Sequence, residues 1–214
     1  MSPPNVAIVD YGAGNLTSVA YALRHLGHDC TITADPDVVA AASRVVFPGV
    51  GAAGAAMANL RERGLDRAIR DVLADGRPVL GICVGCQVVF ERSAEDGGTP
   101  CLGLLPGTVE LFRFPPGVKR KVPHMGWNVV QFERPHEVFA GIPQGSRFYF
   151  VHSYHPLPAD PELVLATSVY GEVRFAAAVC RDNLIAVQFH TEKSGDVGLR
   201  LLDNFVKWDG SKTC

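Results

Sequence analysis

The stretch GICVGCQ, residues 81–87, places a cysteine between two glycines at the point where a buried strand gives way to a helix. PVLGIC, at 78–83, is a short apolar run typical of a buried strand, and we expect the helix that follows to continue to Phe90. A sharp turn from strand to helix needs small residues on either side of the side chain that it exposes. The pattern therefore predicts a nucleophile elbow with Cys83 as the reactive thiol.

The same stretch can also be read as a CxxC pair, because Cys86 lies three residues after Cys83. A redox or metal-binding pair is thus the alternative. A thioredoxin-like pair also sits at a helix start, but it usually follows the first strand of its sheet and lacks the flanking glycines. We favour a single nucleophile, with Cys86 as a small packed hydrophobic residue and with no metal or cofactor.

Length and composition predict the class of protein. The chain has 214 residues, 47% of them hydrophobic, and a formal net charge of -2, which predicts one compact soluble domain over residues 1–214. Near neutrality gives no reason to expect nucleic acid or a membrane surface as a partner, and no apolar run is long enough to span a bilayer. The first residues read as a strand and not as a signal peptide. Six scattered cysteines favour reduced thiols in a cytoplasmic protein.

On the N-terminal side of the elbow, short apolar runs alternate with helical patterns. The runs at 6–10 and 44–49 read as buried strands, and residues 16–26 carry apolar side chains at helical spacing after Asn15, a good N-cap. An alanine-rich stretch, 52–74, reads as a further helix. This alternation predicts a parallel α/β sheet.

Beyond Thr108 the sequence is richer in strands than in helices. Six apolar runs separated by proline and glycine read as strands, at 108–114, 127–132, 147–154, 162–169, 173–180 and 184–190. From Ser194 the apolar residues share one face of a closing amphipathic helix. We therefore expect a central, mostly parallel sheet flanked by helices, with additional antiparallel strands.

A nucleophilic thiol needs a base, and the base needs an orienting group. LIAVQFHTEKS, residues 184–194, offers His190 at the end of a buried strand and Glu192 two residues later. Alternation along a strand puts both side chains on one face, so that Glu192 can hold the imidazole from behind. Six other histidines, in surface-like or aromatic contexts, are weaker candidates: His25, His28, His124, His136, His152 and His155.

Thioester chemistry also needs donors for the oxyanion of the tetrahedral intermediate. One is expected to be the N–H of Val84, directly after the nucleophile. The other is expected from PGVG, residues 48–51, where glycines let the backbone approach or flip, which makes Val50 and Gly51 candidates. An ordinary tight turn after a strand is the alternative interpretation of PGVG.

Five further segments, taken together with the elbow, resemble those of a known family. They are DYGAGN (10–15), PGVGA (48–52), KVPHMGWN (121–128), YFVHSY (149–154) and FHTEKS (189–194). Together they resemble the class I (triad) glutamine amidotransferases and, within them, the HisH family, the glutaminase subunits of imidazole glycerol phosphate synthase. The match runs nearly end to end, and KVPHMGWN and YFVHSY are its most specific parts.

The resemblance implies the class I glutamine amidotransferase fold and a triad of Cys83, His190 and Glu192. The implied reaction is hydrolysis of L-glutamine to glutamate and ammonia through a cysteinyl thioester. A cyclase subunit with a (β/α)₈ barrel, bound as a heterodimer, is implied as the partner. It would use the ammonia to form imidazole glycerol phosphate and an aminoimidazole carboxamide ribotide in histidine biosynthesis. Another class I glutaminase subunit, or a cysteine hydrolase of the α/β elbow type, is the alternative.

The resemblance also suggests roles for residues outside the triad. Glutamine would be bound by Gly49, Gln87, Ser153 and Tyr154. The partner would be contacted by His124, Met125, Gly126, Trp127 and Lys193. An amphipathic tryptophan suits an interface hot spot, although Trp127 could instead be a core residue at a strand start.

Three residues depart from the family pattern. Thr191 stands where the family usually has proline, Cys86 where it has methionine, and Ala53 where it often has an aromatic residue. Proline fixes φ, so its loss loosens the turn that carries Glu192 slightly. None of the three departures removes a catalytic group.

Overall fold

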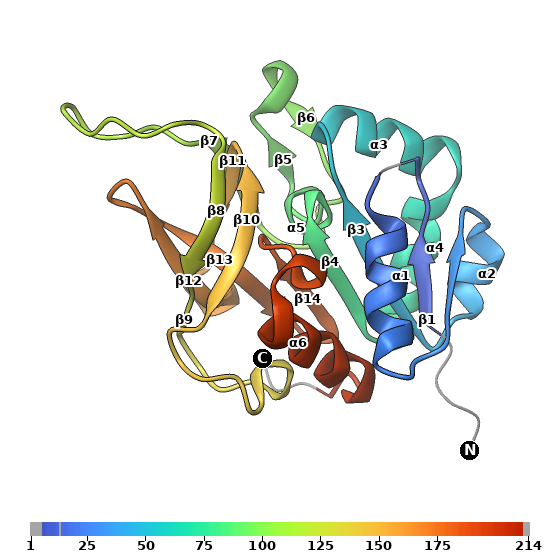
Figure 1. The fold of residues 1–214 in the computed structure, drawn as a ribbon. Helices are drawn as coiled ribbons and strands as arrows, with labels where there is room; N and C mark the ends of the chain where they lie inside the picture. The colour runs from blue at the N-terminus through green and yellow to red at the C-terminus, as the bar shows by residue number, and fades with distance from the viewer. Residues whose placement is uncertain (1–5, 13, 212–214) are drawn as a thin grey trace.

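The computed structural model describes residues 6–12 and 14–211, and its centre is an eight-stranded sheet (Figure 1). The strand order is β2-β1-β3-β4-β14-β13-β12-β9. Five neighbouring strands are parallel: β2 (Cys30–Thr33), β1 (Val6–Val9), β3 (Arg44–Gly49), β4 (Val79–Cys83) and β14 (Leu184–Val187). The remaining three are antiparallel: β13 (Val173–Arg181), β12 (Val164–Tyr170) and β9 (Gln131–Phe132). The expected mostly parallel sheet with added antiparallel strands is confirmed.

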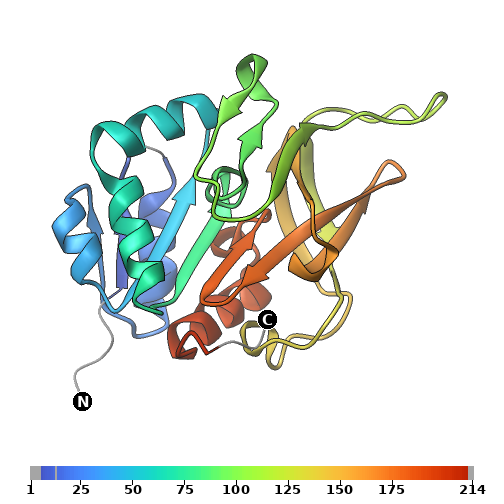
Figure 2. The ribbon, with the colours of Figure 1, turned by 180° about the vertical axis from the view of Figure 1, so that it is seen from behind.

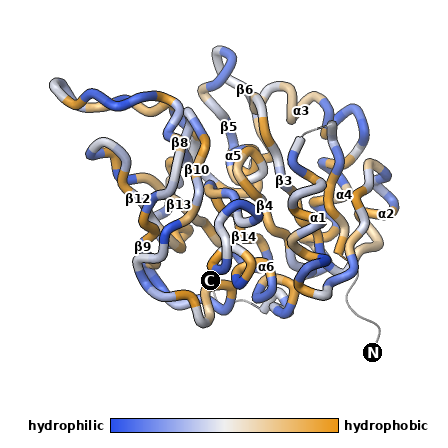
Figure 3. The backbone as a smooth tube through the Cα atoms, viewed as in Figure 1, coloured by the Kyte–Doolittle hydropathy of each residue, from blue (hydrophilic) through white to orange (hydrophobic). Residues whose placement is uncertain are grey.

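Helices cover both faces of the parallel half. α1 (Leu16–His25) and α6 (Gly195–Lys207) pack together on the face toward the viewer in Figure 1. The opposite face, seen in Figure 2, carries α2 (Pro36–Ala41), α3 (Ala53–Glu62) and α4 (Leu65–Ala74). With both faces covered, β1, β4 and β14 are buried at every residue, which explains their continuous apolar sequences. Figure 3 shows these apolar strands inside the molecule.

Two helical expectations are corrected. The stretch 52–74 is two helices and not one, because Gly64 adopts a left-handed φ of 69° between α3 and α4. The helix after the elbow, α5 (Val84–Val88), ends two residues before Phe90. The edge strand β2 and the short helix α2 were not expected, since β2 is only partly buried and lacks a clear apolar pattern.

Two smaller sheets lie beside the antiparallel half of the main sheet. One pairs β8 (His124–Val129) with β10 (Arg147–His152). The other has the order β11-β7-β5-β6 and comprises β11 (Tyr154–Pro158), β7 (Gly107–Leu111), β5 (Arg92–Ser93) and β6 (Thr99–Pro100). Short 3₁₀ turns complete the chain: η1 (Glu95–Gly97), η2 (Glu137–Phe139), η3 (Pro161–Leu163) and η4 (Thr191–Lys193). Each of the six strand-like runs predicted after Thr108 contains a strand.

The expectation that the cysteines are reduced thiols is correct only in part. Cys30, Cys83, Cys86 and Cys101 are free thiols. Cys180 is disulfide-bonded, so the expectation of reduced thiols is wrong there, and Cys214 lies outside the described residues. Within the described part of the chain, no helix has the length and apolarity needed to cross a bilayer.

Candidate active site

The turn between β4 and α5 holds Cys83 in a strained conformation. Its φ of 55° and ψ of −106° lie where a residue with a Cβ pays an energetic penalty, and such residues persist only when their surroundings enforce them. The glycines on either side are sterically required. A Cβ added at Gly85 would lie 2.0 Å from the Phe47 carbonyl oxygen, and one at Gly81 would lie 2.8 Å from the Gly85 carbonyl oxygen. The sequence GxCxG thus forms a sharp turn that presents one thiol.

His190 and Glu192 meet, but for a reason different from the expected one. β14 already ends at Val187, and Glu192 lies in the 3₁₀ turn η4, so strand alternation does not bring the two side chains together. The turn does so instead: His190 Nδ1 lies 2.7 Å from Glu192 Oε1, with the side chains 1% and 0% exposed. The backbone of His190 is held by its N–H, which donates to the Tyr149 carbonyl at 2.9 Å.

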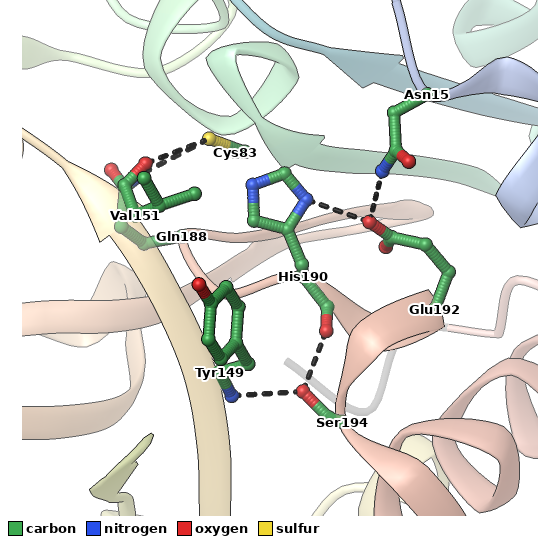
Figure 4. A network of polar contacts seen from close by, with 8 residues as sticks. All are labelled: Asn15, Cys83, Tyr149, Val151, Gln188, His190, Glu192 and Ser194. Atoms are coloured by element: carbon green, nitrogen blue, oxygen red, sulfur yellow. Dashed lines mark hydrogen bonds and ion pairs between the residues drawn. The ribbon is translucent and has the colours of Figure 1, made fainter. Parts of the chain in front are cut away.

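Asn15 is a site residue whose role the sequence pattern does not reveal. It was expected to cap α1, but its φ is 73° and its side chain makes no capping hydrogen bond. Its Nδ2 instead donates to Glu192 Oε1, the same oxygen that contacts His190 (Figure 4). Asparagine tolerates the left-handed region better than most residues. Because it is also a common helix cap, the residue type alone does not distinguish the two roles.

The imidazole of His190 lies between Cys83 and Glu192 (Figure 4). Its buried Nε2 has no hydrogen-bond partner among the described residues, so this nitrogen is available for proton exchange. Burial of the ring disfavours the proton, but Cys83 and Glu192 outweigh burial and raise the pKa of His190 to about 10. His190 therefore holds a proton more tightly than a free imidazole does, because Cys83 and Glu192 stabilise its charged form.

The thiol of Cys83 opens into a pocket of about 360 Å³. The lining residues are Val50, Gly51, Cys83, Val84, Gln87, Glu95, Pro123, Val151, His152, Ser153, Tyr154 and His190. Six of the expected oxyanion and substrate residues are among them. Glu95 was missed, and it is the one carboxylate in this lining; its Oε2 accepts a hydrogen bond of 2.7 Å from the Ala53 N–H.

Positions 49 and 51 each require a glycine, but for different physical reasons. Gly49 was expected to bind substrate, but it does not line the pocket; a Cβ there would lie 1.8 Å from the Tyr11 hydroxyl oxygen. Gly51 lines the pocket with a φ of 97°, and a Cβ there would meet nothing within 4 Å. Packing therefore requires the glycine at position 49, and backbone conformation requires the one at position 51.

Gln87 is fixed by its amide group. Its Nε2 donates to the Tyr154 carbonyl at 3.0 Å and to Gln188 Oε1 at 3.1 Å. Both donor hydrogens of the amide are thereby used, which leaves Oε1 as the atom available to a ligand.

The side chains of β8 alternate between the inside and the outside of the protein, and its first residue, His124, lies inside. His124, expected at a partner interface, is 3% exposed and points inward, whereas Met125 and Trp127 are 63% and 47% exposed on the outer face. A buried side chain cannot contact a partner directly, so the expectation for His124 is wrong, as is the core interpretation of Trp127. Gly126 is half-buried and Lys193 is exposed. His136, expected at the surface, is buried as well.

Replacing Thr191 with proline is expected to stabilise the chain. His190 precedes it in the extended region (φ −88°, ψ 104°), which is compatible with a following proline, and position 191 is the first residue of η4. The Thr191 hydroxyl is buried without a hydrogen-bond partner in the described part of the chain. We expect Thr191→Pro to raise the free energy of unfolding by about 0.5–1 kcal/mol in urea titrations.

The control for this substitution is Thr191→Ala, which removes the buried hydroxyl without fixing φ. A proline variant no more stable than the alanine variant would show that backbone restriction contributes nothing at this turn.

Comparison with known proteins places this geometry in a family. The family model described as glutamine amidotransferase class-I matches residues 7–208. "Imidazole glycerol phosphate synthase subunit HisH" of Methylococcus capsulatus is 53% identical over 214 residues, covering 96% of this chain and 97% of that protein. The HisH subunit of Aromatoleum aromaticum is 52% identical, covering 95% and 98%.

Solved structures agree in fold at much lower identity. The structure of PurLQS from Thermotoga maritima matches with a TM-score of 0.74 and 18% identity, covering 96% of this chain and 98% of that chain. A glutamine amidotransferase from Thermotoga maritima matches with a TM-score of 0.63 and 18% identity, covering 90% and 77%. At these identities the matches establish the fold alone.

Proposed function

The chain belongs to the class I glutamine amidotransferases, and we propose that it is the glutaminase subunit of an imidazole glycerol phosphate synthase. It hydrolyses L-glutamine to glutamate and ammonia, and it supplies the ammonia to a cyclase subunit in histidine biosynthesis. The observation that carries this proposal is the identity of 53% to a HisH subunit over 96% of the chain. The residues 1–214 act as one glutamine amidotransferase domain, in the cytoplasm.

The chemistry starts with Cys83, His190 and Glu192 as the catalytic triad. The Cys83 sulfur attacks the carboxamide carbon of glutamine while His190 Nε2 takes the thiol proton, and this proton then passes to the nitrogen that leaves as ammonia. The remaining thioester is then attacked by a water molecule, which gives a proton to His190 as the carbon–sulfur bond breaks. Glutamate is released, and the proton returns from His190 to the Cys83 sulfur.

Two backbone donors stabilise the oxyanion that forms at each attack. We assign one to the N–H of Val84, which follows the nucleophile at the start of α5. The second comes from Val50 or Gly51, which line the same pocket on the loop after β3. Loss of one donor of this kind typically costs about a hundred- to a thousand-fold in rate.

Recognition of glutamine requires groups for its charged α-amino end. Glu95 is the carboxylate of the pocket, and its bond from the Ala53 N–H fixes it in place, so we assign it to the α-ammonium group of glutamine. Gln87, Ser153 and Tyr154 line the remaining wall. Glu192 is excluded from this role, because its Oε1 already contacts His190.

The partner is a cyclase with a (β/α)₈ barrel, bound as a heterodimer. Met125 and Trp127 are exposed on β8, and Lys193 is exposed in the turn that carries Glu192. An exposed tryptophan next to a methionine is typical of an interface hot spot. Docking at these residues would place the partner beside the pocket from which ammonia leaves.

The isolated chain is expected to be a poor glutaminase that its partner activates, since glutamine hydrolysis without an acceptor is wasteful. We attribute the low basal rate to a loop 48–51 that rests with its donor turned away from the oxyanion. If about 1% of molecules hold the competent loop, activation reaches about a hundredfold and requires roughly 3 kcal/mol of differential binding. Gly51, with its positive φ, lets this loop change conformation at low cost.

The measurement is steady-state glutaminase kinetics of the chain alone, with the cyclase, and with the cyclase and its nucleotide ligand. We expect kcat to rise more than KM falls. Hydrolysis that is absent under all three conditions would refute the proposed function. Full activity in the isolated chain would refute the gating by the loop and would indicate a free-standing glutaminase.

A further inference from the structure

Two buried histidines form a hydrogen-bonded pair that takes no part in the steps described above. His124 begins β8 and His152 ends β10, and the two residues are register partners in that antiparallel pair. His124 Nδ1 lies 3.0 Å from His152 Nε2, and the residues are 3% and 5% exposed. Aromatic rings surround the pair, from Phe112, Phe150, Tyr170 and Phe175.

The hydrogen bonds at the two ends of the pair determine where its protons lie. His152 Nδ1 is 2.8 Å from the Tyr154 carbonyl oxygen, which can only accept, so Nδ1 carries the proton and Nε2 accepts. His124 must then donate from Nδ1. Its Nε2 accepts from Asn128 Nδ2 at 3.3 Å, and the same Nδ2 also donates to the Val169 carbonyl, which identifies it as the nitrogen of that amide.

Both imidazoles are therefore neutral, with their protons on Nδ1. Burial lowers the pKa of His124 to about 4 and, against the hydrogen bond to Tyr154, that of His152 to about 3. The charges of His124, His155 and His190 would further disfavour a proton on His152. A neutral donor at this place avoids a second positive charge beside the His190 imidazolium.

The His124–His152 pair is connected to the glutamine pocket through the carbonyl oxygen of Tyr154. The Tyr154 carbonyl accepts from His152 Nδ1 and also from Gln87 Nε2, at 2.8 Å and 3.0 Å. His152, Tyr154 and Gln87 all line the pocket. At the other end, His124 lies on the strand whose outer face exposes Met125 and Trp127.

We propose that His152, held in its tautomer by His124, is a positioning residue for glutamine: its donated hydrogen bond fixes the Tyr154 carbonyl and, through it, the Gln87 carboxamide against which glutamine binds. This inference rests on the proposed function, because it concerns the same pocket. It also links that wall of the pocket to β8, the strand with the exposed Met125 and Trp127. Loss of this buried hydrogen bond is expected to raise KM for glutamine about tenfold.

Two amide substitutions at position 152 separate positioning from packing. In His152→Asn the side-chain N–H takes the place of the Nδ1 donor, whereas in His152→Gln the amide lies near the former Nε2 and cannot reach the Tyr154 carbonyl in the same way. With the cyclase and its nucleotide ligand bound, we expect KM for glutamine to stay within about threefold of wild type for Asn and to rise about tenfold for Gln. In both variants kcat is expected to change less than KM.

His155→Gln is the matched control. His155 is also buried against Phe112, but its Nδ1 faces the Pro156 carbonyl and it does not line the pocket. Its substitution is expected to lower the melting temperature without raising KM. Nuclear magnetic resonance of the ¹⁵N-labelled imidazoles supplies a second readout, and we expect the Nδ1–H tautomer for both His124 and His152 at pH 7.

Equal KM values for the Asn and Gln variants, or an Nε2–H tautomer at His152, would overturn the positioning role alone. Absence of glutamine hydrolysis by the wild-type heterodimer would overturn the proposed function, and the positioning role with it.

Discussion

Replacing Cys83 with alanine is expected to abolish glutamine hydrolysis, with kcat falling by about four orders of magnitude or more, whereas Cys86→Ala retains most activity. Only Cys83 occupies the strained turn and opens into the pocket. Cys86 is fully buried within α5, and burial, followed by the charge of Cys83, raises its pKa well above the ordinary value. A neutral, buried thiol is a poor nucleophile.

The two cysteines can be compared directly by steady-state assay of the single variants in complex with the cyclase. A glutamine-like electrophile such as a diazo ketone should label Cys83 and leave Cys86 unlabelled, as peptide mapping would reveal. Label on Cys86, or equal loss of activity in the two variants, would revive the CxxC interpretation of the stretch 81–87.

His190→Ala is expected to lower kcat by about four orders of magnitude, and Glu192→Gln by only about ten- to a hundred-fold. The geometry explains the difference. Glu192 Oε1 contacts both His190 Nδ1 and Asn15 Nδ2, whereas Oε2 has no hydrogen-bond partner within residues 6–12 and 14–211. A glutamine can therefore keep its oxygen at the Oε1 position and its amide nitrogen at the Oε2 position, which preserves the histidine tautomer.

The charge of Glu192 is nevertheless lost in this variant, and a pH profile detects that loss. Because the carboxylate helps to raise the pKa of His190, its removal lowers that pKa, and the imidazolium is lost at a lower pH. The alkaline limb of the kcat profile should shift toward lower pH in Glu192→Gln. A Glu192→Gln variant as inactive as Cys83→Ala would show a role beyond orientation, and a silent one would show that another acid orients His190.

The elbow could be predicted from the sequence because its requirements are local. A strand, a cysteine and two glycines at fixed spacing lie within seven residues, and steric exclusion at Gly81 and Gly85 leaves little choice of conformation. The contact between His190 and Glu192 was predicted from the wrong secondary structure. The two residues are two positions apart in either case, so a 3₁₀ turn and a strand bring the side chains within similar reach.

Contacts made over long sequence separations could not be predicted in this way. Asn15 looks like a helix cap, and only the folded chain shows that its amide contacts Glu192. Glu95 follows the elbow in an apparently ordinary surface loop, yet it lines the pocket. In β8 the apolar Met125 is exposed and the polar His124 is buried, the opposite of the usual pattern for a strand. The reason is that His124 is paired with His152.

The contact between Asn15 and Glu192 joins residues 177 positions apart, and it has a consequence for how the protein is made. The nucleophile emerges from the ribosome well before the base, which follows β14 and lies 107 positions after Cys83. A nascent or truncated chain that stops before residue 190 carries a thiol with neither a proton carrier nor an orienting group. Glutamine hydrolysis therefore requires that the chain has been made at least as far as Glu192, so chains that stop earlier do not deplete glutamine.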